Sequence, residues 1–349
     1  MIRETVRQVK PLATSSLLED PFRERSRLAP LEIALLGGRF GFETENPELR
    51  RLVEWAYARL PRHRSRGSAP RFLIKLRLDE SVDGHGDGAV PPISMLSGGG
   101  LLAGVADGSA FAVMSPDSRS AIINVSRSAL RHPYHVRYEL IEFAVFTLAT
   151  RALGLVPLHA GCVGVSGRGV LLIGDSGAGK STLTLQCALA GLDLLSEDSV
   201  LVDPRTLNAT GVPNFAHLCH DGLRFLPSTV AAKVRHSPTI RRRGGAVKLE
   251  IDLRGSTFRQ AQPPLRLTSA VFLSTRPAAD GALLVPLPAR EARSRLRATQ
   301  SYGAAQSGWN AFSRLITARP AFELLRPAHP AQAALILHGL LSGRMKKNR

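Results

Sequence analysis

The sequence lacks several features that would place it in a restricted class of proteins. It holds only 3 cysteines among 349 residues, and their wide spacing argues against a disulfide framework or a Cys/His metal site. No run approaches the ~18 to 20 apolar residues of a membrane span, and the start of the sequence, Met1–Thr5, shows no apolar signal core. We therefore expect a cytoplasmic protein without a membrane partner. We also expect Cys162, Cys187 and Cys219 to be small core residues.

Acidic residues are also scarce relative to basic ones. Lys and Arg number 46 against 28 Asp and Glu, which leaves a net charge of +18. Such a charge suits a polyanionic partner such as nucleic acid, or it reflects arginines spread over the surface. Only Arg241–Arg243 and Lys346–Arg349 form clusters, and no aromatic residues interleave with them, as stacking on single strands requires. Nucleic acid is therefore not the expected partner.

The chain is long enough for two domains. Residues 1–130 have the pattern of a small α+β region, with a helix after Asn46-Pro47, where Asn46 can cap and Pro47 suits the first turn. The rest of this region reads as strands and one Gly- and Pro-rich loop. The predicted strands are 31–36, 71–78, 111–114 and 120–125, and the predicted loop is 83–101.

Residues 131–349 alternate between helical and strand patterns, which indicates an α/β domain. A helix is expected over 137–154. The segment 228–246 is basic and poor in large apolar residues, so we expect a mobile loop there. The main predicted strands are 162–165, 169–173, 193–196, 247–253 and 269–274, and further helices are predicted over 180–190, 290–296 and 331–341.

One segment of this region matches the nucleotide-binding pattern G-x-x-x-x-G-K-[ST]. Glycines let several backbone N–H groups point at one anion, the lysine reaches β- and γ-phosphate oxygens, and the serine hydroxyl can ligate Mg²⁺. The pattern therefore predicts binding of a nucleoside triphosphate with Mg²⁺. Its residues are Gly174, Asp175, Ser176, Gly177, Ala178, Gly179, Lys180 and Ser181, followed by Thr182.

The context of this loop supports the prediction. The apolar run Val170–Ile173 precedes it, and good helix formers follow it from Ser181 to Ala190. Strand, loop and helix in this order point the positive end of the helix at a phosphate. A chain of this length matches the string by chance only about one time in a hundred.

Two acidic residues, Glu197 and Asp198, follow the next apolar strand. A phosphoryl-transfer enzyme needs carboxylates there to hold the metal or to take a proton from a hydroxyl. Taken alone, such a pair is more often a turn, and the single His159 before the loop is more often structural than catalytic. Adjacent parallel strand ends are expected to bring the acidic pair close to Lys180.

Together these segments resemble the catalytic domain of HPr kinase/phosphorylase, and more closely the bacterial HPr-kinase-related kinases of the A type. The resemblance rests on Leu158–Gly161, Gly169–Thr182 and Leu194–Asp198. It is strong over about residues 155 to 205. A weaker cue is Trp55–Pro61, which is similar to the small leading region of the related-kinase subgroup.

The resemblance implies an α/β P-loop kinase domain akin to phosphoenolpyruvate carboxykinase over residues 131–349. It also implies a Ser/Thr-type kinase that uses ATP and Mg²⁺. Carried over by position, Lys180 and Ser181 hold phosphate and metal, and Asp198 lies near the metal. Glu197 takes the place of the general base, and His159 that of an active-site histidine.

Two departures from the family pattern concern the acceptor of the phosphate. Glu197 replaces an aspartate, which extends the carboxylate by one methylene. The Glu-x-Arg-Gly signature is missing from its expected place, where the chain reads Pro213–Leu218, and only Asp252–Gly255 echoes it downstream. We therefore expect the acceptor to be a peptide or small protein other than HPr, by analogy with kinases of peptide-tailoring gene clusters.

Two other functions stay open at this point. The chain could be a P-loop ATPase that couples hydrolysis to a partner, or a non-enzymatic module that binds nucleotide or nucleic acid. Lys248, which follows the loop Arg241–Arg243, could reach phosphate or an acidic acceptor when that loop closes. The alternative is a solvated basic loop. The sequence is compatible with a homo-oligomer and does not name the acceptor.

Overall fold

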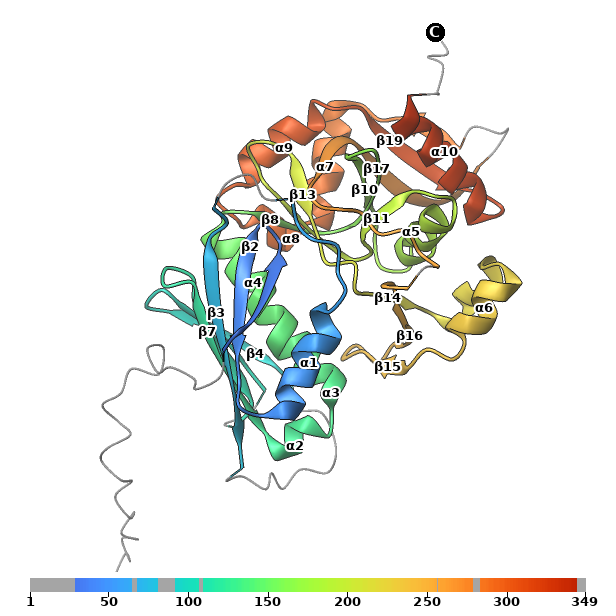
Figure 1. Cartoon of the computed structure of the whole chain (residues 1–349). Coiled ribbons are helices and arrows are strands. Elements are labelled where there is room, and N and C mark those ends of the chain that lie inside the picture. The colour runs from blue at the N-terminus through green and yellow to red at the C-terminus, as the bar shows by residue number, and fades with distance from the viewer. Residues whose placement is uncertain are drawn as a thin grey trace, which may run out of the picture.

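The computed structural model describes residues 29–64, 68–80, 92–106, 109–255, 257–278 and 283–343. Over these ranges the chain is mixed α/β and contains three sheets (Figure 1). A seven-stranded sheet comes from the N-terminal part of the chain. A nine-stranded sheet and a small three-stranded sheet come from the C-terminal part.

The seven-stranded sheet has the order β1-β2-β3-β7-β6-β5-β4, so β1 and β4 are its edges. The four strands predicted in this region are present. The loop predicted over 83–101 is wrong from residue 94 onward, where β4 pairs with β5; residues 83–91 lie outside the described ranges. The strands are β1 (Leu31–Leu35), β2 (Gly38–Glu43), β3 (Arg71–Asp79), β4 (Ser94–Gly98), β5 (Leu101–Val105), β6 (Phe111–Ser115) and β7 (Ser120–Ser126).

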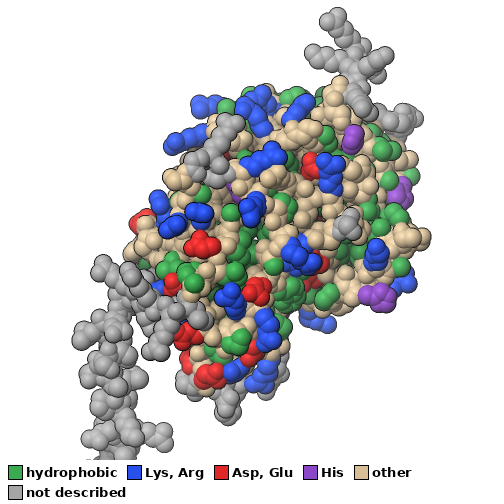
Figure 2. All heavy atoms as spheres, viewed as in Figure 1, with side chains coloured by type: hydrophobic (Ala, Val, Ile, Leu, Met, Phe, Trp, Pro, Cys, Tyr) green, Lys and Arg blue, Asp and Glu red, His purple; other side chains and the backbone are tan. Residues whose placement is uncertain are grey.

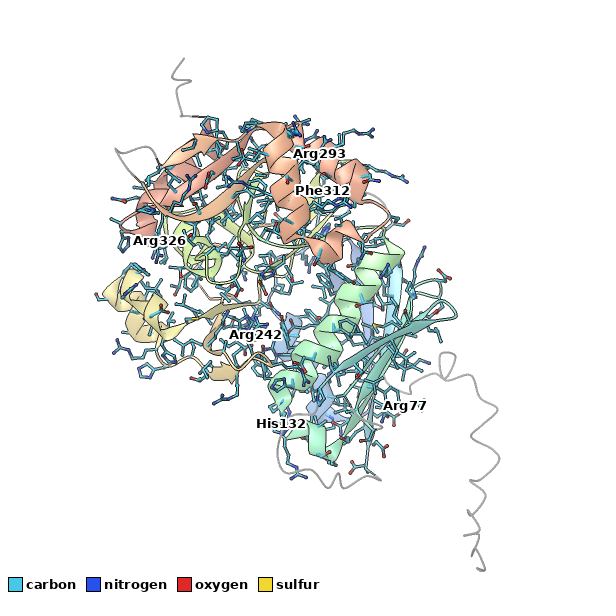
Figure 3. The ribbon with its side chains drawn as sticks, turned by 180° about the vertical axis from the view of Figure 1, so that it is seen from behind. Arg77, His132, Arg242, Arg293, Phe312 and Arg326 are labelled. Carbon is cyan, nitrogen blue, oxygen red and sulfur yellow. The ribbon has the colours of Figure 1, made fainter. Side chains whose placement is uncertain are left out.

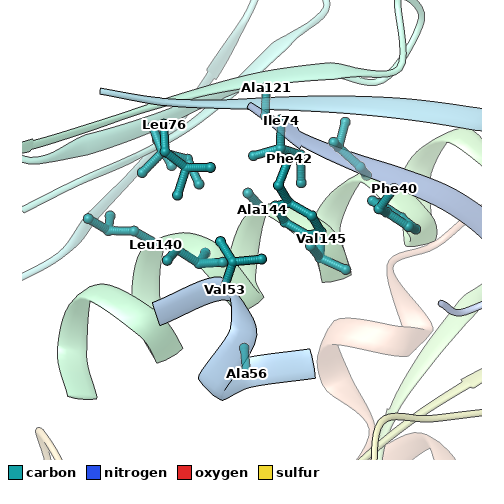
Figure 4. Close-up of a cluster of buried hydrophobic side chains, with 14 of the residues drawn as sticks. Phe40, Phe42, Val53, Ala56, Ile74, Leu76, Ala121, Leu140, Ala144 and Val145 are labelled. Atoms are coloured by element: carbon teal, nitrogen blue, oxygen red, sulfur yellow. The ribbon is translucent and has the colours of Figure 1, made fainter. Parts of the chain in front are cut away.

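Helices cover one face of this sheet. The first, α1, begins after Asn46, whose side chain accepts hydrogen bonds from the backbone N–H of Glu48 and Leu49, as the sequence predicts. Figure 4 shows apolar side chains from the helices meeting apolar side chains from the strands in one buried cluster. The helices are α1 (Pro47–Tyr57), α2 (Arg127–Leu130), α3 (Pro133–His135), η1 (Val136–Glu142) and α4 (Phe143–Ala152).

The helix predicted over 137–154 is present, but its first half, η1, is a π-helix. π-Helical turns are rare in proteins, and those that occur are often found at functional sites. Leu140, Ala144 and Leu148 pack in the same buried cluster as the seven-stranded sheet. The segment just after residue 130 therefore contacts the N-terminal region, and a domain boundary near 130 stays a proposal.

The nine-stranded sheet runs in the order β11-β9-β10-β17-β13-β12-β8, and β18 and β19 extend it beside β17. Among the described strands of this sheet, only the pairs β10–β17 and β17–β19 are parallel. The strands are β8 (Val156–His159), β9 (Gly161–Val165), β10 (Arg168–Ile173), β11 (Asp193–Ser196), β12 (Ser199–Val202), β13 (Asn208–Thr210), β17 (Leu265–Pro277), β18 (Leu284–Pro286) and β19 (Ala321–Arg326).

Helices cover both faces of this sheet, which explains the unbroken apolar run of β10. Val170 and Leu172 pack toward α5 and α10, whereas Leu171 and Ile173 pack toward α7 and α9. A strand buried on both faces needs apolar residues at every position. The helices are α5 (Lys180–Leu189), α7 (Ala289–Thr299), α8 (Ser301–Ala304), α9 (Trp309–Thr317) and α10 (Pro330–Ser342).

The three-stranded sheet has the order β14-β16-β15. Its presence corrects the mobile loop predicted over 228–246, because α6 and β15 fall inside that segment. Ala231, Val234 and Ile240 are buried there, so a few small apolar contacts order a segment with little apolar content. The elements are β14 (Phe215–Leu218), η2 (His220–Phe225), α6 (Ser228–Val234), β15 (Thr239–Arg241) and β16 (Val247–Asp252).

The fold bears on the expectations for the cysteines and for membrane-spanning segments. Cys162 and Cys187 are buried as predicted, but Cys219 is exposed, so the expectation of a core position is wrong for that residue. In the part of the chain that the structure describes, no helix is long and apolar enough to cross a membrane.

Candidate active site

The predicted strand, loop and helix are all present where the pattern lies. β10 ends at Ile173, the loop spans residues 174–179, and α5 begins at Lys180. Gly177 and Gly179 have φ angles of +83° and +93°, which only glycine adopts without strain. A Cβ at either position would meet no atom within 4 Å, so backbone conformation is what requires glycine there.

Lys180 lies under this loop. Its Nζ donates to the carbonyl oxygens of Gly174 at 2.6 Å and Asp175 at 3.2 Å. Burial lowers the pKa of Lys180, and the nearby carboxylates of Asp198, Glu197 and Asp175 oppose that shift. The ammonium group therefore lies where the loop, the helix terminus and the acidic pair meet.

The acidic pair forms the turn between β11 and β12. The expected adjacency of parallel strands is wrong, because β9 lies between β11 and β10 and pairs antiparallel with both. Two antiparallel steps give β11 and β10 the same direction, so their carboxyl ends still lie at one edge of the sheet. The pair reaches the loop by this route.

Glu197 contacts the start of α5 directly, since the Ser181 hydroxyl donates a hydrogen bond to its Oε1. The Glu197 side chain is buried. Burial and the neighbouring charge of Asp198 raise the pKa of Glu197 to about 7, although the bond from Ser181 acts in the opposite direction. A carboxyl group with such a pKa can exchange a proton near neutral pH.

Asp198 has different partners. Its Oδ1 lies 2.9 Å from Nδ1 of His159, and its Oδ2 lies 3.9 Å from Nη2 of Arg242. Burial alone would raise the pKa of Asp198, but the hydrogen bond and charge of His159, together with Arg242, lower it to about 2. Asp198 therefore stays ionised across the physiological range.

Two residues that hold this arrangement were not predicted. The buried Gln300 accepts from the backbone N–H of His159 at 2.7 Å and donates to its carbonyl oxygen at 3.1 Å. Arg242 donates to the Tyr138 hydroxyl at 2.7 Å, and its Nη2 lies 2.9 Å from Nδ1 of His217. Figure 3 labels Arg242 near the middle of the molecule, beside the small sheet. The basic cluster is therefore only partly solvated.

A buried polar network continues from Glu197 toward the N-terminal region. Nδ1 of His217 lies 4.0 Å from Glu197 Oε2, and its Nε2 lies 3.5 Å from Glu250 Oε1. Glu250 in turn pairs with Arg137, which also pairs with Glu142. Burial lowers the pKa of His217, and Glu250 opposes that shift.

One sequence signal could have pointed to this network. In β16 the polar residues Lys248, Glu250 and Asp252 alternate with apolar ones, which marks one polar face. Glu250 is paired in register with His217 on β14. Nothing local to His217 or Arg137 indicates that they meet.

Lys248 and the segment Asp252–Gly255, which the sequence suggested for the acceptor side, lie in different surroundings. Lys248 is among the charges that oppose the raised pKa of Glu197, so it lies near the site. Arg254, in the segment that echoes the family signature, instead pairs with Asp252 and donates to the carbonyl oxygen of Trp55 at 2.5 Å. That segment therefore contacts α1 and the residue that follows it.

The donor set around Ser181 matches the needs of a nucleotide-bound Mg²⁺. This ion binds one or two protein oxygens and completes its shell with phosphate oxygens and water. Ser181 and Asp198 offer such oxygens. Among the described residues no group of three or more His, Cys, Asp or Glu could hold a metal ion.

The chain has only a weak structural likeness to known proteins. No family model and no curated protein matches the chain. Among solved structures, the Hpr(Ser) kinase/phosphatase from Coxiella burnetii shares 18% identity and a TM-score of 0.26, covering 54% of this chain and 88% of that chain. A match this partial assigns neither family nor activity.

Proposed function

We propose that this chain is an ATP-dependent kinase that phosphorylates a Ser/Thr hydroxyl of a peptide or small protein. The main support for this proposal is the Ser181–Glu197 hydrogen bond, which joins the loop–helix junction to a buried carboxyl group. Lys180 lies at the same junction. A phosphate site and a proton acceptor side by side are the two parts that phosphoryl transfer to a hydroxyl requires.

The two carboxyl groups suit different roles. Glu197, with a pKa near 7, can take the proton of the acceptor hydroxyl. Asp198 is ionised throughout and is held by His159 and Arg242, so it suits a permanent charge beside a cation. Environments that move two neighbouring pKa values apart are typical of acid–base sites.

The loop and Lys180 supply the other half of the reaction. Backbone N–H groups of residues 174–179 and the Lys180 ammonium would hold the phosphates of ATP in place. Ser181 and Asp198 would hold Mg²⁺, which neutralises the charge on the transferred group. The acceptor oxygen then bonds to the γ-phosphorus as ADP leaves, and Glu197 receives the proton.

The proposal can be tested with γ-labelled ATP, Mg²⁺ and the products of neighbouring genes. We expect label on one partner, and Lys180→Ala should abolish it. Lys233→Ala is the matched control, because Lys233 is exposed on α6 and should leave transfer unchanged.

Other outcomes identify other functions. Free phosphate alone, lost in Lys180→Ala, would indicate an ATPase. Salt-dependent DNA or RNA binding that survives Lys180→Ala would indicate a nucleic-acid-binding module. On the face shown in Figure 2, Lys and Arg side chains are dispersed among other residues and do not form one stripe, which favours the kinase.

A further inference from the structure

A cavity of about 350 Å³ adjoins the acidic turn, and no residue of the loop 174–179 is part of its lining. Ser196, Glu197, Asp198 and Ser199 all line it. Its volume falls in the lower part of the range of small-ligand sites, roughly 300 to 1,000 Å³. It is thus large enough for one side chain and part of its neighbours, next to the proposed proton acceptor.

Another part of the wall comes from η1, which packs in the buried cluster of the seven-stranded sheet. The π-helix η1 contributes Arg137, Tyr138 and Glu139. The charges of this wall are already matched, because Arg137 pairs with Glu142 and Glu250, and Arg243 donates to Glu139 at 2.7 Å. No strong net charge from these groups is left to attract a charged ligand.

The rest of the lining is mainly apolar. Ile93, Phe143, Phe146 and Val212 contribute to it, together with Met95 from the edge strand β4. Met95 is 57% exposed, so it lies at an accessible rim. Apolar walls favour an uncharged ligand, since a charge moved there would lose its hydration without gaining a partner.

Two polar atoms of the lining residues, Nε of Arg137 and Nε2 of His217, are buried without a hydrogen bond in the described part of the chain. The side chain of His217 is 7% exposed, and the nearest Glu250 oxygen lies 3.5 Å from its Nε2. Buried polar atoms usually have a partner, so a ligand with a backbone amide or hydroxyl group would supply one to His217.

We propose that this cavity is the acceptor pocket, and that it takes a serine or threonine flanked by uncharged, apolar residues in a peptide. The proposal rests on the kinase function proposed above. The hydroxyl would face Glu197, a neighbouring side chain would contact Met95 and Ile93, and the peptide backbone would be in reach of His217. Acceptor recognition would then be shared between η1, β4 and the acidic turn.

Three capped tripeptides test the pocket with the full chain, γ-labelled ATP and Mg²⁺: N-acetyl-Leu-Ser-Leu-amide and the same peptide with both leucines replaced by Glu or by Lys. We expect labelling of the leucine peptide to exceed that of either charged peptide by roughly tenfold, the scale of discrimination in an apolar pocket.

A matched pair of variants separates the pocket from general effects of an edge-strand mutation. Met95 and Leu96 are adjacent and are 57% and 59% exposed, but only Met95 lines the cavity. Met95→Asp should lower labelling of the leucine peptide roughly tenfold, whereas Leu96→Asp should leave it unchanged.

Each contrary result counts against a specific statement. Preference for a charged peptide, equal effects of the two variants, or no labelling of any peptide by a protein that binds ATP would overturn the pocket. Absence of Lys180-dependent ATP binding in the unmodified chain would instead overturn the kinase function itself.

Discussion

Glu197 and Asp198 are neighbours in the chain, yet their carboxyl groups lie in different surroundings. Glu197 is buried against Ser181, whereas Asp198 faces His159 and Arg242. The pKa of Glu197 is raised to about 7 and that of Asp198 lowered to about 2. The direction of each shift follows from which charges each carboxylate meets.

The first prediction concerns the pH dependence of transfer. Below about pH 7 Glu197 gains a proton and can no longer act as a base, so the rate should fall about tenfold for each further pH unit. Glu197→Gln should lower the rate by about 10² to 10⁴ and remove this dependence. Rates of labelling measured from acid to neutral pH check both points. A Gln variant that keeps the same dependence would show that another group is the base.

The same shift predicts a gain in stability when the group is removed. The folded protein holds the Glu197 proton up to about pH 7, whereas the unfolded chain loses it near 4.5. The folded state thus binds more protons between these values, and its stability falls as pH rises through them, by up to about 3 kcal/mol. Glu197→Gln lacks this dependence. In urea unfolding, the free energy of unfolding of the variant should increase relative to that of the unmodified protein from about pH 5 to about pH 8. A constant difference would contradict the assignment.

At the scale of elements, η1 is joined to β16 by a buried ion pair. Arg137 and Glu250 each have side chains 1% exposed. The guanidinium group also lies over the rings of Trp55 and Phe215 at 4.5 and 4.3 Å. The π-helix, the first helix and the small sheet thus meet around one cation.

The corresponding prediction is a large loss of stability in Arg137→Ala. Removing the cation leaves the carboxylates of Glu250 and Glu142 without the guanidinium group that neutralises them, which should cost about 3 to 5 kcal/mol. Arg127→Ala is the control, because Arg127 pairs with Glu48 and Glu80 at the surface, where an ion pair contributes little to stability. Denaturant unfolding of both variants gives the comparison, and equal losses would contradict the role of Arg137.

The helix cap gives a second prediction at this scale. Asn46 Oδ1 accepts from Glu48 N at 2.9 Å and Leu49 N at 3.0 Å. Asn46→Ala should therefore cost about 1 kcal/mol, and Asn46→Asp much less. The difference between their unfolding free energies measures the cap. Indistinguishable variants would show that α1 is held by its packing alone.

At the scale of the whole molecule, contacts cross between the N-terminal and C-terminal parts at several places. Arg254 donates to Trp55 O at 2.5 Å, and Asn214 donates to Ala56 O at 3.2 Å. Leu201, from the nine-stranded sheet, lies in the buried cluster of the seven-stranded sheet. Such contacts should couple the unfolding of the two parts.

The chain has two tryptophans, and they report on the two parts separately. Trp55 packs beside the first buried cluster and Trp309 lies in the second. Trp55→Phe and Trp309→Phe should each show one unfolding midpoint, equal by fluorescence and by far-UV circular dichroism. ATP with Mg²⁺ should raise both midpoints. Different midpoints by the two methods within one variant would show that the parts unfold independently.

Much of the fold could be predicted from the sequence because its signals are local. The cap at Asn46, the alternation in β3 and the apolar run of β10 each depend on residues within one element. Predictions failed where order comes from distant contacts. The segment 228–246 has few large apolar residues, yet Ile240 and Val234 are buried by packing against other elements.

The sequence alone determined the loop of residues 174–179, the lysine after it and the acidic pair, because strand, loop and helix are contiguous and their residue types follow from local geometry. Only the tertiary structure decided how the acidic pair reaches the loop, with β9 between the two strands. It also decided that His217, Glu250 and Arg137 form one network, and that η1 and β4 close a cavity beside Glu197. These residues are far apart in the chain, and their meeting depends on how whole sheets and helices pack.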